Sequence, residues 1–118
     1  MSELQMGVIE AKFADVIWSS EPVSGAALAK KAEAAFQWKR TTTYTVLKRL
    51  CDKGIFQNNS GVVTSCISRE EYYARHSKQY VEETFQGSLP AFLAAFTKGK
   101  PLTEQERDEI RRMIDAAE

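Results

Sequence analysis

Apolar side chains recur at helical spacing in the first part of the chain. In residues 4–18 they lie three or four positions apart, which is typical of a helix with one buried face. These apolar positions are Met6, Ile9, Phe13, Val16 and Ile17. The segment Ser19-Ser20-Glu21-Pro22 ends this helix, because proline disfavours helical backbone at the residue before it. Val23 then favours a short extended segment, and Ser24 is a good N-cap for a second helix that runs to about residue 36.

The stretch 39–55, KRTTTYTVLKRLCDKGI, predicts a helix with two chemically different faces. At about 100° per residue, one sector is apolar, and Gly54 follows it where a left-handed cap is expected. The apolar sector contains Thr43, Val46, Leu47 and Leu50. The other side carries hydroxyls and cations, from Arg40, Thr41, Thr42, Tyr44, Thr45, Lys48 and Arg49. These side chains suit the major groove of DNA, although a solvated helix packed on a core shows the same pattern.

The order of elements predicts a winged helix-turn-helix. The polar connection Gln37-Trp38-Lys39 joins the second helix to the basic third helix, as in a helix-turn-helix. After Gly54, the pattern predicts two strands, 55–57 and 62–67, around the turn 58–61. A hairpin directly after a recognition helix is a wing. We therefore expect residues 1–67 to form a winged-helix DNA-binding domain, in a fold that is mainly α with a small β-hairpin wing.

Residues 68–118 predict three further helices. Capping boxes begin two of them, at Ser68 and Thr103, and Ser88 can cap the helix between them. Their apolar stripes have no further sheet to cover, so they pack either on the first domain or on a second copy of the chain. We favour a dimer, because helix-turn-helix proteins use two-fold dimers on paired half-sites. The predicted dimerisation residues are Tyr72, Tyr73, Tyr80, Phe85, Leu89, Phe92, Leu93, Phe96, Ile110, Met113 and Ile114.

Charge is distributed unevenly along a chain whose formal net charge is zero. Residues 30–54 hold seven Lys and Arg against two Asp and Glu, whereas residues 68–118 hold eight against ten. A basic middle beside an acidic end fits a DNA-contacting part joined to a part with another task.

The sequence offers little for catalysis or for metal binding. The cysteines, Cys51 and Cys66, lack ligand spacing, and the one histidine, His76, has no acid pair or phosphate loop beside it. We predict no enzyme activity, no cofactor and no metal, with Cys51 as a small buried residue. No apolar run approaches the roughly 20 residues of a membrane span, and no signal peptide is evident, so we expect a cytoplasmic protein without membrane insertion.

Four segments resemble the penicillinase-repressor family of transcriptional regulators (the BlaI/MecI type). They are WKRTTTYTVLKRLCDKGI, SREEYYARHSK, GSLPAFLAAF and LTEQERDEIRRMID, and the resemblance runs from about residue 8 to residue 117. Its most specific part is W-x-R-T-T-x-Y-T-x-L-x-R-L-x-x-K-G. The family consists of winged-helix homodimers that repress operons, often for β-lactam resistance or metal handling.

The resemblance implies that the third helix enters the major groove and that the C-terminal helices form the dimer. The implied DNA contacts are Arg40, Thr41, Thr42, Thr45, Lys48 and Arg49, and we predict Lys39 and Tyr44 as further contacts beside them. Position 39 is often a capping serine in relatives, so with lysine here either Thr41 caps one turn later or the helix start is less well held. The wing is short and has no Lys or Arg between Phe56 and Ser68, which predicts few phosphate contacts and a shallow salt dependence.

The resemblance also suggests a candidate proteolytic switch. In the antibiotic-resistance members a membrane sensor protease signals, and the repressor is cut at an Asn-Phe bond in the dimerisation segment. The matching bond here is Ala95-Phe96, which keeps the phenylalanine but not the asparagine. Copper-responsive relatives carry a C-terminal cysteine cluster, which IRRMIDAAE lacks.

The sequence thus predicts a homodimeric repressor that binds a pseudo-palindromic DNA operator, with antibiotic (β-lactam) resistance or related stress genes as targets. The alternative is a winged-helix regulator that binds proteins or senses small molecules and has little intrinsic DNA specificity.

Overall fold

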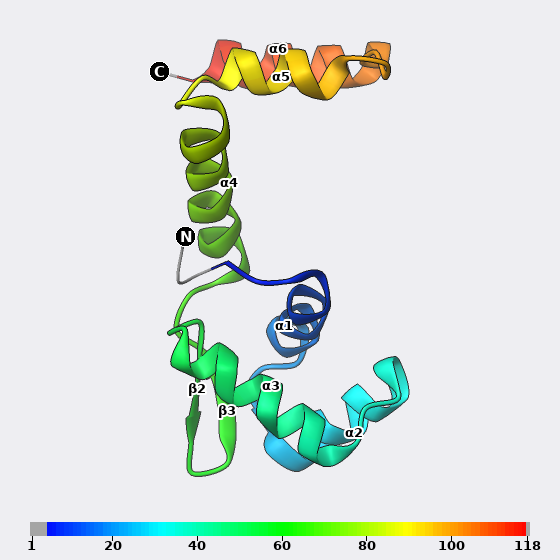
Figure 1. Ribbon diagram of the computed structural model, residues 1–118, viewed down its shortest axis with the longest axis vertical. Helices are drawn as coiled ribbons and strands as arrows, with labels where there is room; N and C mark the ends of the chain where they lie inside the picture. Colours follow the sequence, from blue (N-terminus) through cyan, green and yellow to red (C-terminus); the bar gives the residue numbers. More distant parts are fainter. Residues whose placement is uncertain (1–4, 118) are drawn as a thin grey trace. The chain divides into compact units, whose positions relative to one another are not determined.

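The computed structural model describes residues 5–117, and within them it contains six helices and three short strands (Figure 1). The elements are α1 (Val8–Ser20), β1 (Val23–Ser24), α2 (Gly25–Phe36), α3 (Arg40–Asp52), β2 (Phe56–Asn59), β3 (Val62–Ser65), α4 (Arg69–Phe85), α5 (Leu89–Thr97) and α6 (Glu104–Ala116). The chain divides into two compact units, the first ending at Gln79 and the second beginning at Tyr80. The predicted fold class, mainly α with a small β wing, is confirmed.

The core of the first unit is made by α1, α2, α3 and the sheet. The helical spacing of α1 buries Phe13 and Ile17 completely, and Leu28 of α2 and Leu50 of α3 meet them. The apolar sector predicted for the third helix is the buried one: Thr43, Val46, Leu47 and Leu50. Burying this sector fixes which face of α3 points outward.

The three strands form one antiparallel sheet in the order β1-β3-β2. Val23, predicted as an extended segment, pairs with Val63. Strand β2 runs two residues further than predicted, and a two-residue loop, Ser60 and Gly61, replaces the predicted turn 58–61. Both loop residues have positive φ, 54° and 90°, as in the hairpin turns whose twist matches that of the flanking strands.

Helix α1 begins later than predicted. Leu4 lies outside the described residues, but Gln5, Met6 and Gly7 are not helical, and the helix starts at Val8. The Gly7 N–H donates a hydrogen bond of 3.1 Å to Oε1 of Glu10, which fixes the start of the helix there. Met6 packs against the core without being helical. Apolar spacing alone therefore extended the helix into the segment before its cap.

Helix α3 ends at a glycine, as predicted. Gly54 has φ +80°, its N–H donates to the Cys51 carbonyl, and the N–H of the buried Ile55 donates to the Leu50 carbonyl. These two bonds, of 2.9 and 3.2 Å, form a Schellman motif, in which the left-handed residue is usually glycine.

Gly54→Ala is expected to lower the free energy of unfolding by about 1 kcal/mol, since left-handed backbone penalises a Cβ. An added methyl would meet no atom within 4 Å, so the loss reports backbone conformation and not a clash. Urea denaturation measures it, and Gly54→Asn, which tolerates this conformation better, should lose less. An alanine variant as stable as the parent would contradict the expected strain.

The second unit has a partly covered apolar cluster. Rings of Tyr80 and Phe85 from α4 and Phe92 from α5 lie 5.6–6.1 Å apart. Helices α5 and α6 lie side by side (Figure 1) and line a hollow of about 250 Å³. The predicted caps are present: Ser88 Oγ accepts the Ala91 N–H, and Thr103 and Glu106 form the capping box. No residue of α5 or α6 is buried.

Candidate nucleic-acid interface

The residues predicted to contact DNA lie on the outward side of α3 and at its N-cap. We call these residues the recognition face, and all of them are exposed: Lys39, Arg40, Thr41, Thr42, Tyr44, Thr45, Lys48 and Arg49. The division arises because the core takes the apolar sector of the same helix. The result is one surface that combines hydroxyls with cations.

The threonines of α3 differ in whether their hydroxyls already make a hydrogen bond within the protein. Thr45 Oγ1 donates to the Thr41 carbonyl at 2.9 Å, and the buried Thr43 Oγ1 donates to the Lys39 carbonyl at 3.4 Å. Within the described part of the chain, the hydroxyls of Thr41 and Thr42 have no hydrogen-bond partner. These two hydroxyls are therefore free to bind a ligand at the N-terminal end of the face.

The cations also differ along the helix. Lys48 pairs with Asp52 at 3.1 Å, an exposed pair of the weak kind. Arg49 lies 3.9 Å from a Glu10 oxygen. By contrast, among residues 5–117 the side chains of Lys39 and Arg40 have no ionic partner. The uncompensated positive charge is thus greatest at the start of α3.

The structure decides between the two alternatives for the start of this helix. Lys39 occupies the N-cap position with extended backbone (φ −71°, ψ 155°), and its side chain makes no capping hydrogen bond. The helix begins at Arg40, so Thr41 lies inside it and does not serve as a cap one turn later. The helix start therefore lacks the side-chain acceptor that serine would supply.

Lys39→Ser is expected to raise the free energy of unfolding by about 1 kcal/mol, because the serine oxygen can accept a free N–H of the first turn. Thermal and urea denaturation measure the gain. Lys39→Ala removes the same charge without supplying an acceptor, and it should not stabilise. Equal stability of the serine and alanine variants would contradict a capping effect.

One glycine that sequence reasoning missed joins three elements of this unit. Gly25 is the first residue of α2, and its N–H donates to the Gly61 carbonyl in the wing turn at 3.0 Å. A Cβ at this position would lie 3.2 Å from Cε1 of Tyr44 on the recognition face. Its place directly after the Ser24 cap marked a helix start, but nothing in the sequence revealed the contact with Tyr44.

The wing presents neutral polar groups. Its exposed polar residues are Gln57, Asn58, Asn59 and Ser60, and the apolar Val62 is also exposed. Asn58 Oδ1 accepts the Gly61 N–H at 3.0 Å and so holds the turn. The shallow salt dependence expected from a wing without cations stays a prediction.

The predicted dimerisation residues fall into two groups. Tyr72 is only 2 % exposed and lies in the core of the first unit, 5.7 Å from the Trp18 ring, so it has no surface to give to a second chain. Tyr73 is exposed in the same unit. The others belong to the second unit. Exposed there are Tyr80, Leu89, Phe96, Met113 and Ile114, and partly buried are Phe85, Phe92, Leu93 and Ile110.

The remaining residues singled out in the sequence are the candidate cleavage bond, the cysteine Cys51 and the histidine His76. The Ala95-Phe96 bond lies near the end of α5, and both residues are exposed. Cys51 is partly buried, and burial raises the pKa of its thiol. His76 stacks on the Tyr72 ring at 5.6 Å. Within residues 5–117, no three potential metal ligands gather, and no helix has the length and apolarity to cross a membrane.

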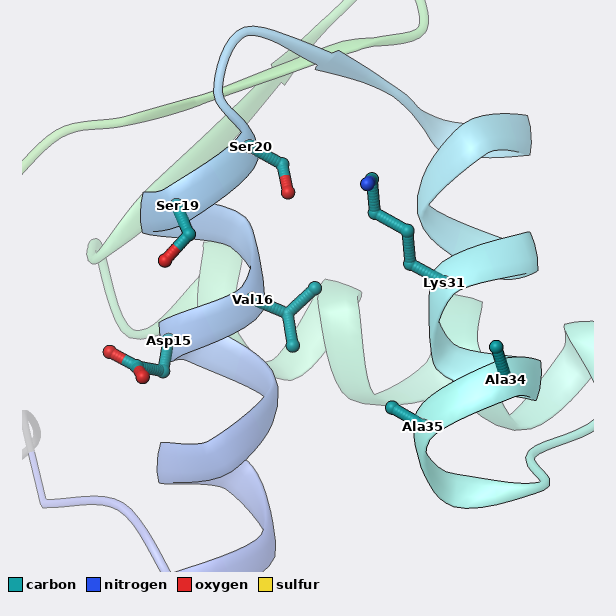
Figure 2. A pocket seen from close by; sticks show the side chains of 7 residues that line it. All are labelled: Asp15, Val16, Ser19, Ser20, Lys31, Ala34 and Ala35. Atoms are coloured by element: carbon teal, nitrogen blue, oxygen red, sulfur yellow. The ribbon is translucent and has the colours of Figure 1, made fainter.

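A further hollow of about 470 Å³ lies between α1 and α2 (Figure 2). Val16 points into it from α1, and the Lys31 side chain extends along its α2 side. Its other lining residues are Asp15, Ser19, Ser20, Ala34 and Ala35. None of them belongs to the recognition face, so this hollow is separate from the candidate interface.

Comparison with known proteins gives two findings. The family model for the penicillinase repressor matches residues 6–116. The penicillinase repressor of Bacillus licheniformis is 22 % identical over 115 residues, which cover 94 % of this chain and 90 % of the relative.

Proposed function

The chain belongs to the penicillinase repressor family of transcriptional repressors, and from this premise we propose that it is a homodimer that binds a pseudo-palindromic DNA operator sequence-specifically. The observation that carries the proposal is the recognition face: two free hydroxyls and two unpaired cations lie together at the start of the exposed face of α3. In helix-turn-helix proteins the N-terminal residues of this helix contact base edges.

The proposed chemistry follows from the side chains. Arginine can donate two parallel hydrogen bonds to guanine, threonine methyls can pack on thymine methyls, and threonine hydroxyls can bind phosphate or base edges. Lys48 and Arg49, further along the helix, would hold phosphates and fix the register. The contacts at the start of α3 would recognise the base sequence, and the cations along the helix would attract the DNA phosphates.

Dimerisation is proposed through the second unit. Helices α5 and α6 bury no residue of their own, and Phe96, Met113 and Ile114 are each more than half exposed. Apolar side chains exposed together on two helices mark a surface for a partner, and two-fold pairing would place two recognition helices on paired half-sites. Tyr72 is left out of this surface because the first unit already buries it.

Induction by proteolysis is proposed at the Ala95-Phe96 bond, with a membrane sensor protease acting directly or indirectly. The bond lies within α5, so a cut there would break the proposed dimer surface. Incubating the purified repressor with a sensor protease from the same genome and mapping the products by mass spectrometry tests it. An intact bond would remove this proposal and leave DNA binding untouched.

Footprinting and gel shift with the promoter region of the protein's own gene, at two salt concentrations, test the proposed function. We expect protection of a dyad-symmetric site that weakens as salt rises. Absence of a protected site at low salt would reject the repressor function for this winged helix and favour a role in protein contact or small-molecule sensing.

A further inference from the structure

One carboxylate from α1 lies against the C-terminal end of the recognition helix. The two Glu10 oxygens lie 3.2 and 3.4 Å from Nζ of Lys53, and Oε2 lies 3.9 Å from the Arg49 guanidinium. The Glu10 side chain is 15 % exposed, and that of Lys53 is 25 % exposed. Both charges of this pair are therefore largely removed from solvent.

The chain around Glu10 holds the carboxylate in place. Gly7 N–H donates to it, and Lys53 also donates to the Gln5 carbonyl at 2.8 Å. Burial alone would raise the pKa of Glu10, but hydrogen bonds from Gly7 and Lys53 outweigh burial and keep this pKa below its usual value. Glu10 is thus a fixed negative charge at neutral pH.

This arrangement divides the cations at the end of α3. Lys53 is occupied by two acceptors and is mostly covered. Arg49 is 58 % exposed, and its longer contact with Glu10 leaves it able to reach a phosphate. Non-specific DNA affinity grows with the number of cations that neutralise phosphates, so a carboxylate that occupies cations limits it.

We propose that Glu10 is a positioning residue for DNA binding. It keeps Lys53 from contacting DNA phosphates and orients Arg49, and so it raises the ratio of operator affinity to non-operator affinity. The inference rests on the proposed function. It assigns to an α1 residue outside the recognition face a part in specificity.

The test compares Glu10→Gln with Glu71→Gln. Glu71 pairs with Arg75 on α4, so the control removes the same charge and frees an arginine outside the recognition helix. For Glu10→Gln on a non-operator duplex, the slope of log K against log salt should steepen by about 0.9 for each additional phosphate that the protein neutralises. We expect one or two additional phosphates and a specificity ratio that falls several-fold, whereas Glu71→Gln should leave the slope unchanged.

A second variant separates this role from a merely structural one. Glutamine can still accept the Gly7 N–H, and circular dichroism checks the fold. Adding Lys53→Met to Glu10→Gln should restore part of the original slope, while Lys53→Met alone should change it little. Equal slopes for the parent and Glu10→Gln, or equal changes in both glutamine variants, would overturn the proposal. If the parent protein binds DNA without preferring an operator, that result rejects the proposed function. The salt slopes on the non-operator duplex still test whether Glu10 limits the number of phosphates that the protein neutralises.

Discussion

Arg40→Ala is expected to weaken operator binding by about 1–3 kcal/mol, or roughly 5- to 150-fold, while the protein stays folded. Arg40 is the first residue of α3, is exposed, and has no ionic partner within the described residues. Its removal therefore leaves the packing of the core unchanged and removes a free guanidinium from the proposed interface. Fluorescence anisotropy titration of the footprinted operator at one fixed salt concentration measures the change.

Two further variants sharpen this prediction. Arg75→Ala removes the same charge from α4, where the arginine pairs with Glu71, and should change operator affinity little. Arg40→Lys keeps the charge but loses the planar guanidinium. Compared with Arg40→Ala, it should therefore recover more of the affinity for non-operator DNA than of the affinity for the operator. Equal losses for Arg40→Ala and Arg75→Ala would show that Arg40 contributes only net charge, and would contradict base reading.

The recognition helix was predictable because its information is local. Periodicity over 13 residues separates Thr43, Val46, Leu47 and Leu50 from the hydroxyls and cations, and the structure buries the former and exposes the latter. Caps at Ser24, Ser88 and Thr103 and the left-handed Gly54 were likewise marked by residues adjacent in sequence. When the core of a single domain buries one face of a helix, the sequence also indicates which side chains the opposite face exposes to solvent.

Contacts between distant segments were not predictable in this way. Glu10 and Lys53 are 43 residues apart, and each is one of several charged residues in its segment, so the sequence gives no sign that these two meet. Tyr72 belongs by sequence to the apolar residues of α4 that we predict for dimerisation, yet the first unit buries it against the Trp18 ring. Periodicity alone does not distinguish an apolar stripe that covers its own domain from one that awaits a partner.

Trp18 is the residue at which such distant segments converge. Its ring lies 5.2 Å from Phe56 of β2 and 5.7 Å from Tyr72 of α4. Its Nε1–H donates to the Ile67 carbonyl at 3.0 Å, in the connection that leads into α4. The Arg69 guanidinium lies 5.9 Å from the ring centroid. One side chain of α1 thus joins the wing to the start of α4.

Trp18→Ala is expected to lower the free energy of unfolding of the first unit by about 3–5 kcal/mol, through lost burial and the cavity left behind. This is a large share of the roughly 5–15 kcal/mol that typically stabilises a protein. Trp18→Phe keeps an aromatic ring but leaves the Ile67 carbonyl without its donor, so a smaller loss of about 1–3 kcal/mol is expected. Urea denaturation measures both, and the phenylalanine variant keeps the test open if the alanine variant does not fold.

Trp38→Ala is the matched control, because Trp38 is only partly buried and packs on Phe13 and Phe36 at the edge of the core. It makes no hydrogen bond to the connection before α4, and it should cost less than Trp18→Ala. If the two alanine variants lose equal stability, the Trp18 contacts with the wing and with α4 add nothing to ordinary aromatic burial. If Trp18→Ala alone also weakens operator binding at a temperature where it is folded, these contacts hold the wing and the recognition helix in their binding arrangement.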